Sequence, residues 1–342
     1  MSPLTFISDP MVWLTTISRV HATTTAVPCF ALDLCVRKFT TSTRLDLSSL
    51  TSLVVSAEPV RAKAVQDFIT TFCKFGLQER ALWPSYGLAE HVAAATSRCN
   101  NTKMGGLLKF ASSRNSATKG NVLISVGTRW AEYGEVDLRV VNVDTFTEVE
   151  PGDEGEIWLH SAACAMGYWN LPDLTQAQFK AKLKSDTHKE YLRTGDLGFV
   201  EDGHLFISGR FKELIIIRGE KHYLHDLETA AQSATRVVRP GCVVATPITE
   251  AETKSDTNAA DRILIIAEVR EREQATIEVC RQIVEKIKAE SGVLVTQVVL
   301  IPTHKICKTS SGKIQRTQTA HALQTGEIKA LLRFSTPADS PS

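Results

Sequence analysis

The chain has 342 residues, of which 43% are hydrophobic and 23% are charged, as in an average soluble globular protein. Its formal net charge of +1 gives no electrostatic support for nucleic-acid binding, so we expect no nucleic acid among its partners. No run approaches the roughly 20 apolar residues of a membrane-spanning helix, and the N-terminus has no secretory signal pattern. We therefore expect a cytoplasmic protein that does not span a membrane.

The eight cysteines stand singly, with no Cys-x-x-Cys pair and no histidine nearby at metal-ligand spacing. This pattern favours neither a zinc site nor a secreted disulfide framework, and a reducing compartment explains it more simply. The length allows two ordinary domains, each with its own apolar core.

Short β-rich runs alternate with helical stretches in the first two-thirds of the chain. Residues 53–55 predict a strand, and the apolar pattern that follows predicts a helix over residues 61–72. Farther on, residues 154–160 predict another strand. The segment 98–120 is rich in Ser, Asn, Lys and Gly and predicts a loop or an insertion. This alternation favours a layered α/β fold.

The pattern becomes more compact toward the C-terminus. Strands are predicted at residues 203–208 and 214–217. After these come a helix from His225, strands at 241–248 and 262–269, a long helix that stops at Gly292, and a strand at 293–301. The long helix is expected to bury one apolar face made of Ile277, Cys280, Ile283, Val284 and Ile287.

These patterns divide the chain near Gly209-Arg210. We expect a first domain over residues 1–209 and a small α+β domain over residues 210–334. Residues 335–342 have the Ser, Pro and Asp content of a disordered tail.

The run Tyr191-Leu-Arg-Thr-Gly-Asp-Leu-Gly-Phe199 contains the first candidate binding residue, Asp196. We expect Asp196 in a glycine-flanked turn, where its carboxylate can accept hydrogen bonds from two adjacent hydroxyls, as in a ribose 2′,3′-diol. Arg210, just beyond the next predicted strand, could supply a fixed cation to the same nucleotide. Taken alone, the two residues have a plainer interpretation as a turn carboxylate and a surface charge.

These residues do not stand alone, because the runs 191–199, 202–206 and 209–213 resemble the nucleotide-binding and hinge motifs of the adenylate-forming superfamily. This superfamily includes the acyl-CoA synthetases, the luciferases and the adenylation domains of peptide synthetases. The resemblance implies that residues 1–209 are the C-terminal portion of a large AMP-binding domain, a layered α/β structure with a β-rich subdomain. It also implies that residues 210–334 are a small mobile domain that turns about a hinge at Lys212.

Two further segments resemble the nucleotide site of this superfamily. Residues 85–90, Ser-Tyr-Gly-Leu-Ala-Glu, are similar to its adenine and magnesium motif. The resemblance implies that Tyr86 lies against the adenine ring beside Gly87, and that Glu90 is a catalytic residue near the magnesium held by the phosphates. A plain core aromatic is the alternative for Tyr86. The loop that closes over the base is matched by Ala57, Glu58 and Pro59.

Near the C-terminus, residues 308–316, Lys-Thr-Ser-Ser-Gly-Lys-Ile-Gln-Arg, resemble the catalytic lysine motif of the superfamily, with Lys313 in the place of the lysine. This run is not a P-loop, because Cys307 stands where that pattern needs glycine and Ile314 where it needs Ser or Thr. A lysine on a flexible Ser/Gly loop can swing in and place its charge between an acyl carboxylate and the α-phosphate. The plain alternative is a solvated loop lysine.

Within the superfamily, the likeness points to the fatty-acyl-AMP ligases and the related domains of disco-interacting proteins. It is carried by segments 1–6, 13–19, 30–37 and 215–223, of which the first three resemble the helix and substrate-pocket segment of that branch. The resemblance implies an enzyme that uses ATP and Mg to convert a fatty acid to acyl-AMP, with release of pyrophosphate. The resemblance implies that the acyl group goes to the phosphopantetheine thiol of an acyl carrier protein in preference to CoA.

The chain also departs from this pattern. A Ser/Thr/Gly-rich phosphate loop ending in Pro-Lys-Gly has no counterpart in the sequence, which implies a chain that starts inside the large domain and needs the missing half for ATP activation. Ser56 stands where the branch usually has Gly and could narrow the adenine site. Three alternatives therefore stay open: a ligase encoded with further N-terminal sequence, an inactive module that binds AMP, acyl-AMP or a partner protein, and a decayed fragment.

Overall fold

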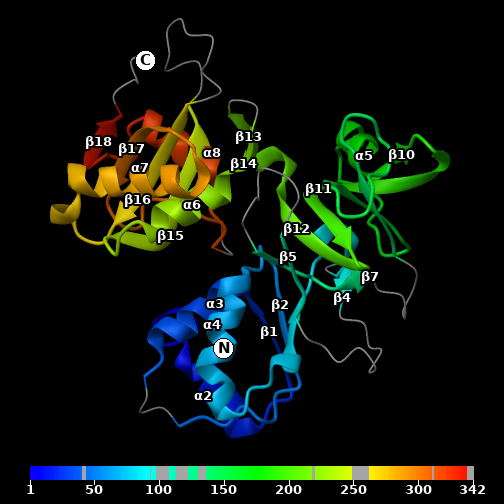
Figure 1. Ribbon diagram of the computed structural model, residues 1–342, viewed down its shortest axis with the longest axis horizontal. Coiled ribbons are helices and arrows are strands. Elements are labelled where there is room, and N and C mark those ends of the chain that lie inside the picture. The colour runs from blue at the N-terminus through cyan, green and yellow to red at the C-terminus, as the bar shows by residue number, and fades with distance from the viewer. Residues whose placement is uncertain are drawn as a thin grey trace, which may run out of the picture. The chain divides into compact units, whose positions relative to one another are not determined.

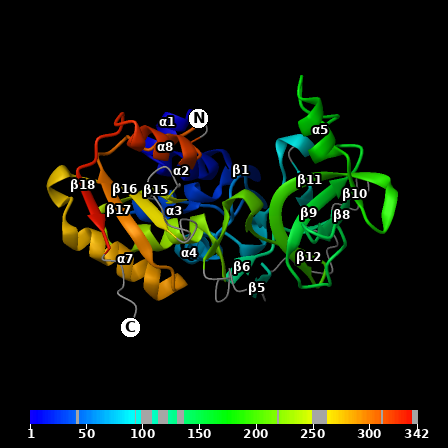
Figure 2. The same ribbon diagram turned by 90° about the horizontal axis from the view of Figure 1, so that it is seen from above.

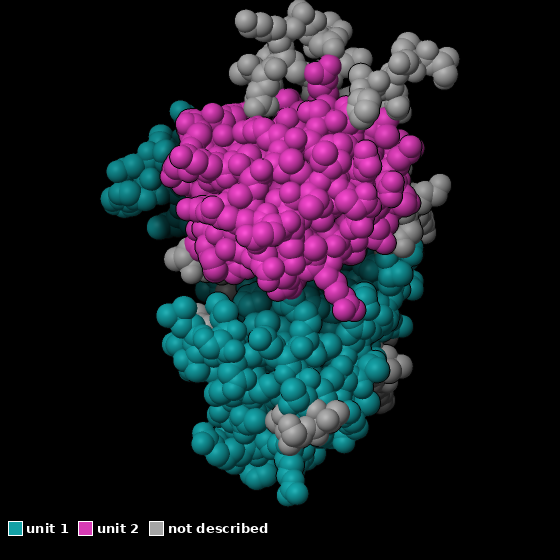
Figure 3. Space-filling model, turned by 90° about the vertical axis from the view of Figure 1, so that its left-hand side faces the viewer, with its two compact units in different colours: residues 1–211 teal, residues 212–342 magenta. Residues whose placement is uncertain are grey.

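The computed structural model describes residues 1–40, 44–92, 94–97, 108–112, 122–129, 136–217, 220–248, 262–309 and 312–336. It divides into two compact units, Met1–Phe211 and Lys212–Ser342, which are coloured separately in Figure 3. The sequence patterns placed the division between residues 209 and 210. Of the tail expected at 335–342, Ser335 is the last residue of a strand, and residues 337–342 lie outside the described part.

Unit 1 begins with a three-stranded parallel sheet and its helices (Figure 1). The strands, in spatial order, are β1 (Thr24–Pro28), β2 (Ser52–Ser56) and β3 (Leu82–Pro84). The helices are α1 (Pro3–Ser8), α2 (Met11–Val20), α3 (Cys29–Lys38) and α4 (Ala62–Phe72). Leu53 and Val55 alternate inward along β2 and pack in one buried cluster with Phe68 and Phe72 of α4. The predicted strand and helix at this point are confirmed.

Because β1, β2 and β3 are parallel, their carboxyl ends lie at one edge of the sheet. Pro28 pairs with Ser56, and Val55 pairs with Pro84. Three segments leave the sheet at this edge, namely the start of α3, the loop at 57–59 and the segment 85–90. Ligands of parallel α/β sheets bind at the carboxyl ends of the strands, so this edge is the first place to look for a site.

The second part of unit 1 is an antiparallel sheet in the order β10-β11-β9-β8, with β12 paired to β11. Its elements are β8 (Asp137–Val141), β9 (Gly155–His160), α5 (Pro172–Phe179), β10 (Ala181–Leu183), β11 (Asp186–Glu201) and β12 (His204–Arg210). The strands predicted at 154–160 and 203–208 correspond to β9 and β12, and five of the six residues of β9 are buried.

Two short strand pairs and several 3-10 turns complete unit 1. The pairs are β4 (Thr96–Ser97) with β7 (Thr128–Arg129), and β5 (Phe110–Ser112) with β6 (Val122–Ile124). The turns are η1 (Cys73–Phe75), η2 (Glu79–Ala81) and η3 (Ala89–His91). The segment predicted as a loop at 98–120 therefore contains strand β5, while residues 98–107 and 113–120 lie outside the described part.

Unit 2 is a four-stranded mixed sheet with helices on both faces. After η5 (Phe211–Glu213) and the hairpin β13 (Leu214–Ile217) and β14 (Glu220–Tyr223), it follows the order β15-β16-β17-β18. The bounds are α6 (Leu224–Ser233), β15 (Val238–Pro247), β16 (Ile263–Val269), η8 (Arg272–Gln274), α7 (Ile277–Ser291), β17 (Val295–Ile301), α8 (Arg316–Gln324) and β18 (Leu332–Ser335). The elements predicted from residue 214 to residue 301 are all present.

Strand β16 explains why both faces are covered, because every residue of it is buried. Ile263 and Ile265 pack with α6 and α7, whereas Leu264 and Ile266 pack in the cluster that contains α8. Figure 2 shows α7 and α8 on opposite sides of this sheet. The apolar run at residues 263–267 is typical of a strand buried between two helical layers.

The predicted apolar face of α7 needs one correction. Ile277 is 50% exposed, and Val279 is buried in its place. At 3.6 residues per turn, Ile277 lies about 120° around the helix from Ile283, outside the stripe that faces the sheet. Gly292 ends the helix in the left-handed conformation, with a φ of 71°, as its position predicted. Among the described residues, no helix combines the length and apolarity that crossing a bilayer requires.

Candidate functional site

Tyr86 lies two residues beyond β3, at the carboxyl edge of the parallel sheet, and is 8% exposed. Its backbone N–H donates to Thr96 Oγ1 at 3.1 Å, and the Thr96 hydroxyl donates to the carbonyl of Val126 at 2.6 Å. Tyr86 therefore has a fixed place at the sheet edge before any ligand arrives. Gly87 is the next residue, in the same segment between β3 and η3.

Asp196 and Arg210 meet Tyr86 at this point. The Tyr86 hydroxyl donates to Asp196 Oδ2 at 2.7 Å, across 110 residues of sequence, and Arg210 Nε donates to Asp196 Oδ1 at 2.7 Å. Burial and the charge of Asp196 raise the pKa of Tyr86 well above its usual value, so the phenol stays a donor. An ionised carboxylate accepts hydrogen bonds through both oxygens, so Asp196 joins the segment after β3 to strand β12 at this edge.

The prediction that Asp196 lies in a turn is wrong. Asp196 lies inside strand β11, and Arg210 is the last residue of β12, paired in register with Asp196. The pairing of β11 with β9 shifts register between Arg193 and Leu197, and Gly195 has a φ of +70°. The glycine therefore marks a β-bulge, which needs the same backbone freedom as a turn and re-aims the next side chain.

Glu156 holds this bulge in place and was not singled out from the sequence. It is 2% exposed in β9, and its Oε1 accepts from the backbone N–H of Gly195 at 3.0 Å. Its Oε2 accepts from Trp158 Nε1 at 3.0 Å and from Arg193 Nε at 2.9 Å. The sequence did offer one signal, because Glu156 lies in a run predicted as a strand, and a buried carboxylate needs hydrogen-bond or charged partners.

Glu90, in η3, is held by another residue that sequence reasoning missed. The Tyr168 hydroxyl donates to Glu90 Oε1 at 2.7 Å and lies 2.9 Å from Gln178 Oε1. Burial and Glu90 raise the pKa of Tyr168 to about 12. One carboxylate suits Mg²⁺, which keeps several waters and takes other oxygens from phosphates. No group of three or more His, Cys, Asp and Glu that could hold a metal occurs among the described residues.

The loop at 57–59 is tied to the neighbouring segments of the sheet edge. Ala57 has a φ of +71°, which is rare for a residue with a side chain, and Pro59 is exposed. The Glu58 carboxylate accepts from the backbone N–H of Phe30 in the first turn of α3. Ser56 donates through its hydroxyl to the carbonyl of Ser85 at 3.0 Å. The loop and the start of α3 are therefore held together.

In unit 2, Lys313 sits on a narrow hairpin with its side chain exposed. Lys308 and Ile314 form a β-bridge, and the N–H of Thr309 donates to the carbonyl of Lys313 at 2.8 Å. Below them, the N–H of Gln315 donates to the carbonyl of Cys307 at 2.9 Å. These bonds hold the backbone on both sides of residues 310–311, and those two residues of the predicted flexible loop lie outside the described part.

Two buried side chains anchor the base of this hairpin to the core of unit 2. Glu268, 1% exposed, accepts through Oε1 from the backbone N–H groups of Lys305 at 2.7 Å and Ile306 at 2.8 Å. Although burial opposes its charge, these bonds and Arg239 lower the pKa of Glu268. Thr319, fully buried in α8, accepts from the N–H of Cys307 at 3.1 Å. Lys212, the expected hinge, is an exposed residue of η5 at the division between the units.

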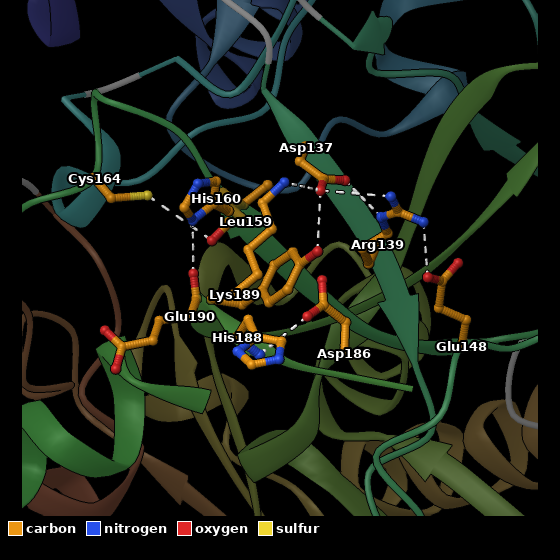
Figure 4. Close-up of polar contacts among 11 residues, drawn as sticks. Asp137, Arg139, Glu148, Leu159, His160, Cys164, Asp186, His188, Lys189 and Glu190 are labelled. Carbon is orange, nitrogen blue, oxygen red and sulfur yellow. Dashed lines mark hydrogen bonds and ion pairs between the residues drawn. The ribbon is translucent and has the colours of Figure 1, made fainter. Parts of the chain in front are cut away.

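A second charged cluster lies on β8 and β11 and stabilises the antiparallel sheet (Figure 4). Asp137 accepts from Arg139, Lys189 and the Tyr191 hydroxyl, the last at 3.0 Å, and Arg139 also pairs with Glu148 at 2.7 Å. Burial would raise the pKa of Asp137, but these hydrogen bonds lower it to about 2. The charges in this cluster are satisfied by one another, so we assign it a structural role.

Two protein-family models match the chain. The model described as "AMP-binding enzyme" matches residues 1–169, and the model described as "Disco-interacting protein 2-like, AMP domain" matches residues 212–332. The two matches cover different parts of the chain, one in each unit.

Curated relatives and solved structures agree with these models. The chain is 37% identical over 330 residues to the medium-chain-fatty-acid–[acyl-carrier-protein] ligase JamA of Moorena producens, covering 93% of the chain and 55% of the relative. It is 32% identical over 357 residues to the long-chain-fatty-acid–AMP ligase FadD26 of Mycobacterium tuberculosis, covering 97% and 58%. The chain spans about half the length of these relatives.

A crystal structure of the fatty acyl-adenylate ligase of L. pneumophila, in complex with acyl adenylate and pyrophosphate, is 29% identical with a TM-score of 0.59, and the match covers 98% of this chain and 58% of that one. The two family models, the curated relatives and this structure all lead to one assignment. The chain belongs to the adenylate-forming superfamily of AMP-binding enzymes, and it is similar to the fatty-acid–AMP ligases within it.

Proposed function

We propose that the protein that carries this chain activates a fatty acid with ATP to acyl-AMP, releases pyrophosphate, and passes the acyl group to the phosphopantetheine thiol of an acyl carrier protein. The observation that carries this proposal is the convergence of the Tyr86 hydroxyl and the Arg210 guanidinium on the buried carboxylate of Asp196. The similarity to a carrier-protein ligase and to fatty-acid–AMP ligases supports the substrate class and the acceptor.

The nucleotide would bind at the carboxyl edge of the parallel sheet. Asp196 would accept hydrogen bonds from the ribose hydroxyls, because an ionised carboxylate is a pure acceptor with about four lone-pair sites. The Tyr86 ring and Gly87 would line the adenine site, and Arg210 would add a fixed positive charge beside the ribose. The loop of Ala57, Glu58 and Pro59 would close over the base.

Glu90 would share a magnesium ion with the phosphates of ATP. When bound, this ion would neutralise negative charge on the phosphates. Tyr168 would orient Glu90 through the hydrogen bond at 2.7 Å, which leaves one carboxylate for the ion. This arrangement fits the preference of Mg²⁺ for few protein ligands.

Lys313 would act in the first chemical step. A carboxylate oxygen of the fatty acid attacks the α-phosphorus of ATP, an acyl–phosphate bond forms, and the bond to pyrophosphate breaks. The ammonium group of Lys313 would balance the negative charge that builds up between the carboxylate and the α-phosphate. A turn of unit 2 about Lys212 would remove Lys313 for the thiol-transfer step, and the exposed position of Lys212 at the division between the units supports this role.

The acyl chain would lie in an apolar tunnel that includes the segment of α3, which begins at the same sheet edge. A carrier-protein thiol is the proposed acceptor ahead of CoA. The scattered cysteines support a reducing compartment such as the cytoplasm for the reaction.

The first experiment measures AMP binding to the 342-residue chain by isothermal titration calorimetry, with Asp196→Asn and Tyr86→Phe as variants. Loss of a charged hydrogen bond is worth about 1.5–3 kcal/mol, so we expect D196N to weaken AMP about 10- to 100-fold. Tyr86→Phe keeps the aromatic ring and the Asp196 carboxylate and removes only the hydroxyl that bonds Asp196 and Thr194, so its effect on AMP affinity should be smaller. No saturable AMP binding by the wild type would overturn the nucleotide site.

A second candidate is an inactive module that holds AMP or acyl-AMP, or binds a partner protein. ATP–pyrophosphate exchange with fatty acids of graded length separates the two candidates. Exchange that depends on a fatty acid supports the ligase, whereas AMP binding without exchange, in the longest protein expressed from the gene, supports the module.

A further inference from the structure

Arg316 joins two motifs of unit 2 that are far apart in the sequence. It is the first residue of α8 and follows Lys313 by three positions. Its Nε and Nη2 donate to the two carboxylate oxygens of Glu228, in α6, at 2.6 and 2.9 Å. Its Nη1 donates to Glu213 Oε1 at 2.7 Å, across 103 residues of sequence. One guanidinium therefore connects α8 with α6 and with η5.

This three-residue clamp is partly buried. The side chains of Arg316, Glu228 and Glu213 are 20%, 11% and 28% exposed. Burial opposes the charge of the guanidinium, but the hydrogen bonds and charges of both glutamates raise the pKa of Arg316 above its usual value. Charge-assisted bonds of this two-pronged kind are shorter and stronger than neutral ones. The clamp is therefore a firm connection, whose loss would leave two carboxylates facing each other.

The clamp lies between the start of unit 2 and the lysine hairpin. On one side, Glu213 is the residue directly after Lys212. On the other side, Gln315 precedes Arg316 and closes the hairpin through its bond to Cys307. Glu228 Oε1 also accepts from the N–H of Ala245 at 3.0 Å, which ties the clamp to strand β15.

We propose that Arg316 is a positioning residue that locks the Lys313 hairpin to the segment after the hinge, so that Lys313 and Glu213 move as one rigid body when unit 2 turns about Lys212. This inference rests on the proposed function, which gives Lys212 and Lys313 their roles. Arg316 acts through Lys313 and does not itself contact the reacting groups. Misplacing a catalytic group by about 1 Å can slow a reaction about 100-fold, which sets the scale of the expected effect.

The test uses Arg316→Met, which keeps a long unbranched side chain, and Glu213→Gln, which removes the negative charge on the hinge side and leaves the pair with Glu228. We expect each variant to slow fatty-acid-dependent ATP–pyrophosphate exchange about 10- to 100-fold per mole of folded protein, with little change in AMP affinity. The double variant should be no slower than R316M alone, because both changes break one connection. Arg139→Met, which removes another arginine with two carboxylate partners, is the matched control and should leave the exchange rate near wild type.

A second comparison asks whether Arg316 acts through the lysine. In a Lys313→Ala background, R316M should cause no further loss of rate. A further loss of rate in that background would overturn the proposal. Exchange rates for R316M and E213Q equal to wild type would also overturn it. A purely structural salt bridge would give that second result, because its loss lowers the melting temperature and leaves the rate per folded molecule unchanged.

Hydrogen–deuterium exchange gives a readout that needs no activity. The amides of residues 305–309 and 312–316 should exchange faster in R316M and E213Q, while those of β16 and β17 keep their protection. Unchanged exchange in the hairpin would overturn the clamp. Absence of AMP binding and of pyrophosphate exchange in the wild type would instead defeat the proposed function, so the two failures are distinguishable.

Discussion

The candidate site of unit 1 is built from buried side chains. The candidate residue of unit 2 has an exposed side chain, and only the residues that hold its backbone are buried. Asp196 and Tyr86 are 6% and 8% exposed and hold each other through a hydrogen bond. Lys313 is exposed, and buried Glu268 and Thr319 accept hydrogen bonds from backbone N–H groups at the base of its hairpin. A group that binds ligand gains from having its side chain fixed in advance, whereas a group that acts in one step gains from a fixed backbone and a free side chain.

The strongest test of this contrast is Lys313→Ala. We expect acyl-adenylate formation to fall about 100- to 1000-fold, the size typical of losing one group that stabilises developing charge. Since the described bonds of residue 313 are made by its backbone, the melting temperature and the AMP affinity should stay near wild type. Lys329→Ala, another exposed lysine of unit 2, is the control. A K313A variant that melts early or binds AMP poorly would remove the contrast.

The next test changes the buried foundation of unit 1. In Glu156→Gln, an amide group faces the donors of Gly195, Trp158 and Arg193, so at least one bond is lost and Arg193 loses its counter-charge. Breaking a buried pair in this way typically costs about 3 kcal/mol of unfolding free energy. Urea unfolding followed by tryptophan fluorescence measures it, because all five tryptophans lie within residues 1–211.

The control for this change is Glu148→Gln. Glu148 pairs with Arg139 at 2.7 Å but is 43% exposed, so its loss should change stability by less than about 1 kcal/mol. Asp196 follows the bulge that Glu156 holds, and we therefore expect E156Q to weaken AMP binding as well. Equal stability of E156Q and E148Q would show that burial does not distinguish the two carboxylates.

Lowering the pH should have a smaller effect on the unfolding free energy. The pKa of Asp137 is about 2 in the folded protein and 3.8 as its ordinary value, so its ionised form stabilises unit 1 above about pH 4. This contribution, up to about 2 kcal/mol, is lost as the pH falls from 4 toward 2. Unfolding free energies measured by tryptophan fluorescence between pH 2 and pH 6 should therefore fall less steeply for Asp137→Asn than for the wild type. Parallel curves for the two proteins would contradict the assignment.

The sequence predicted those features that depend on neighbours in the chain. Apolar periodicity predicted α4 and β17. The pattern Thr-Gly-Asp indicated a departure from regular strand backbone, which the structure has at Gly195. It could not tell a bulge from a turn, because that distinction depends on which strands pair with β11 and in which register. Ile277 was misplaced for a related reason, since only the packed sheet decides which edge of an amphipathic helix is covered.

The residues that position the candidate site, Tyr168 and Glu156, could not be predicted from the sequence. Tyr168 and Glu90 are 78 residues apart, and Glu156 and Gly195 are 39 residues apart. No local pattern connects such pairs, and their hydrogen bonds exist only once the sheets have formed. The roles given to Asp196, Glu90 and Lys313 came from motif resemblance and stay predictions, to be tested by the variants above.

The clamp of Arg316 also bears on how the chain is made. Synthesis runs from the N-terminus, so Glu213 and Glu228 emerge from the ribosome long before the arginine that neutralises them. A nascent chain that stopped before α8 would keep two partly buried carboxylates without this cation. The foundation of Lys313 is therefore among the last parts of unit 2 to assemble, and the lysine gains its fixed place only in a nearly finished polypeptide.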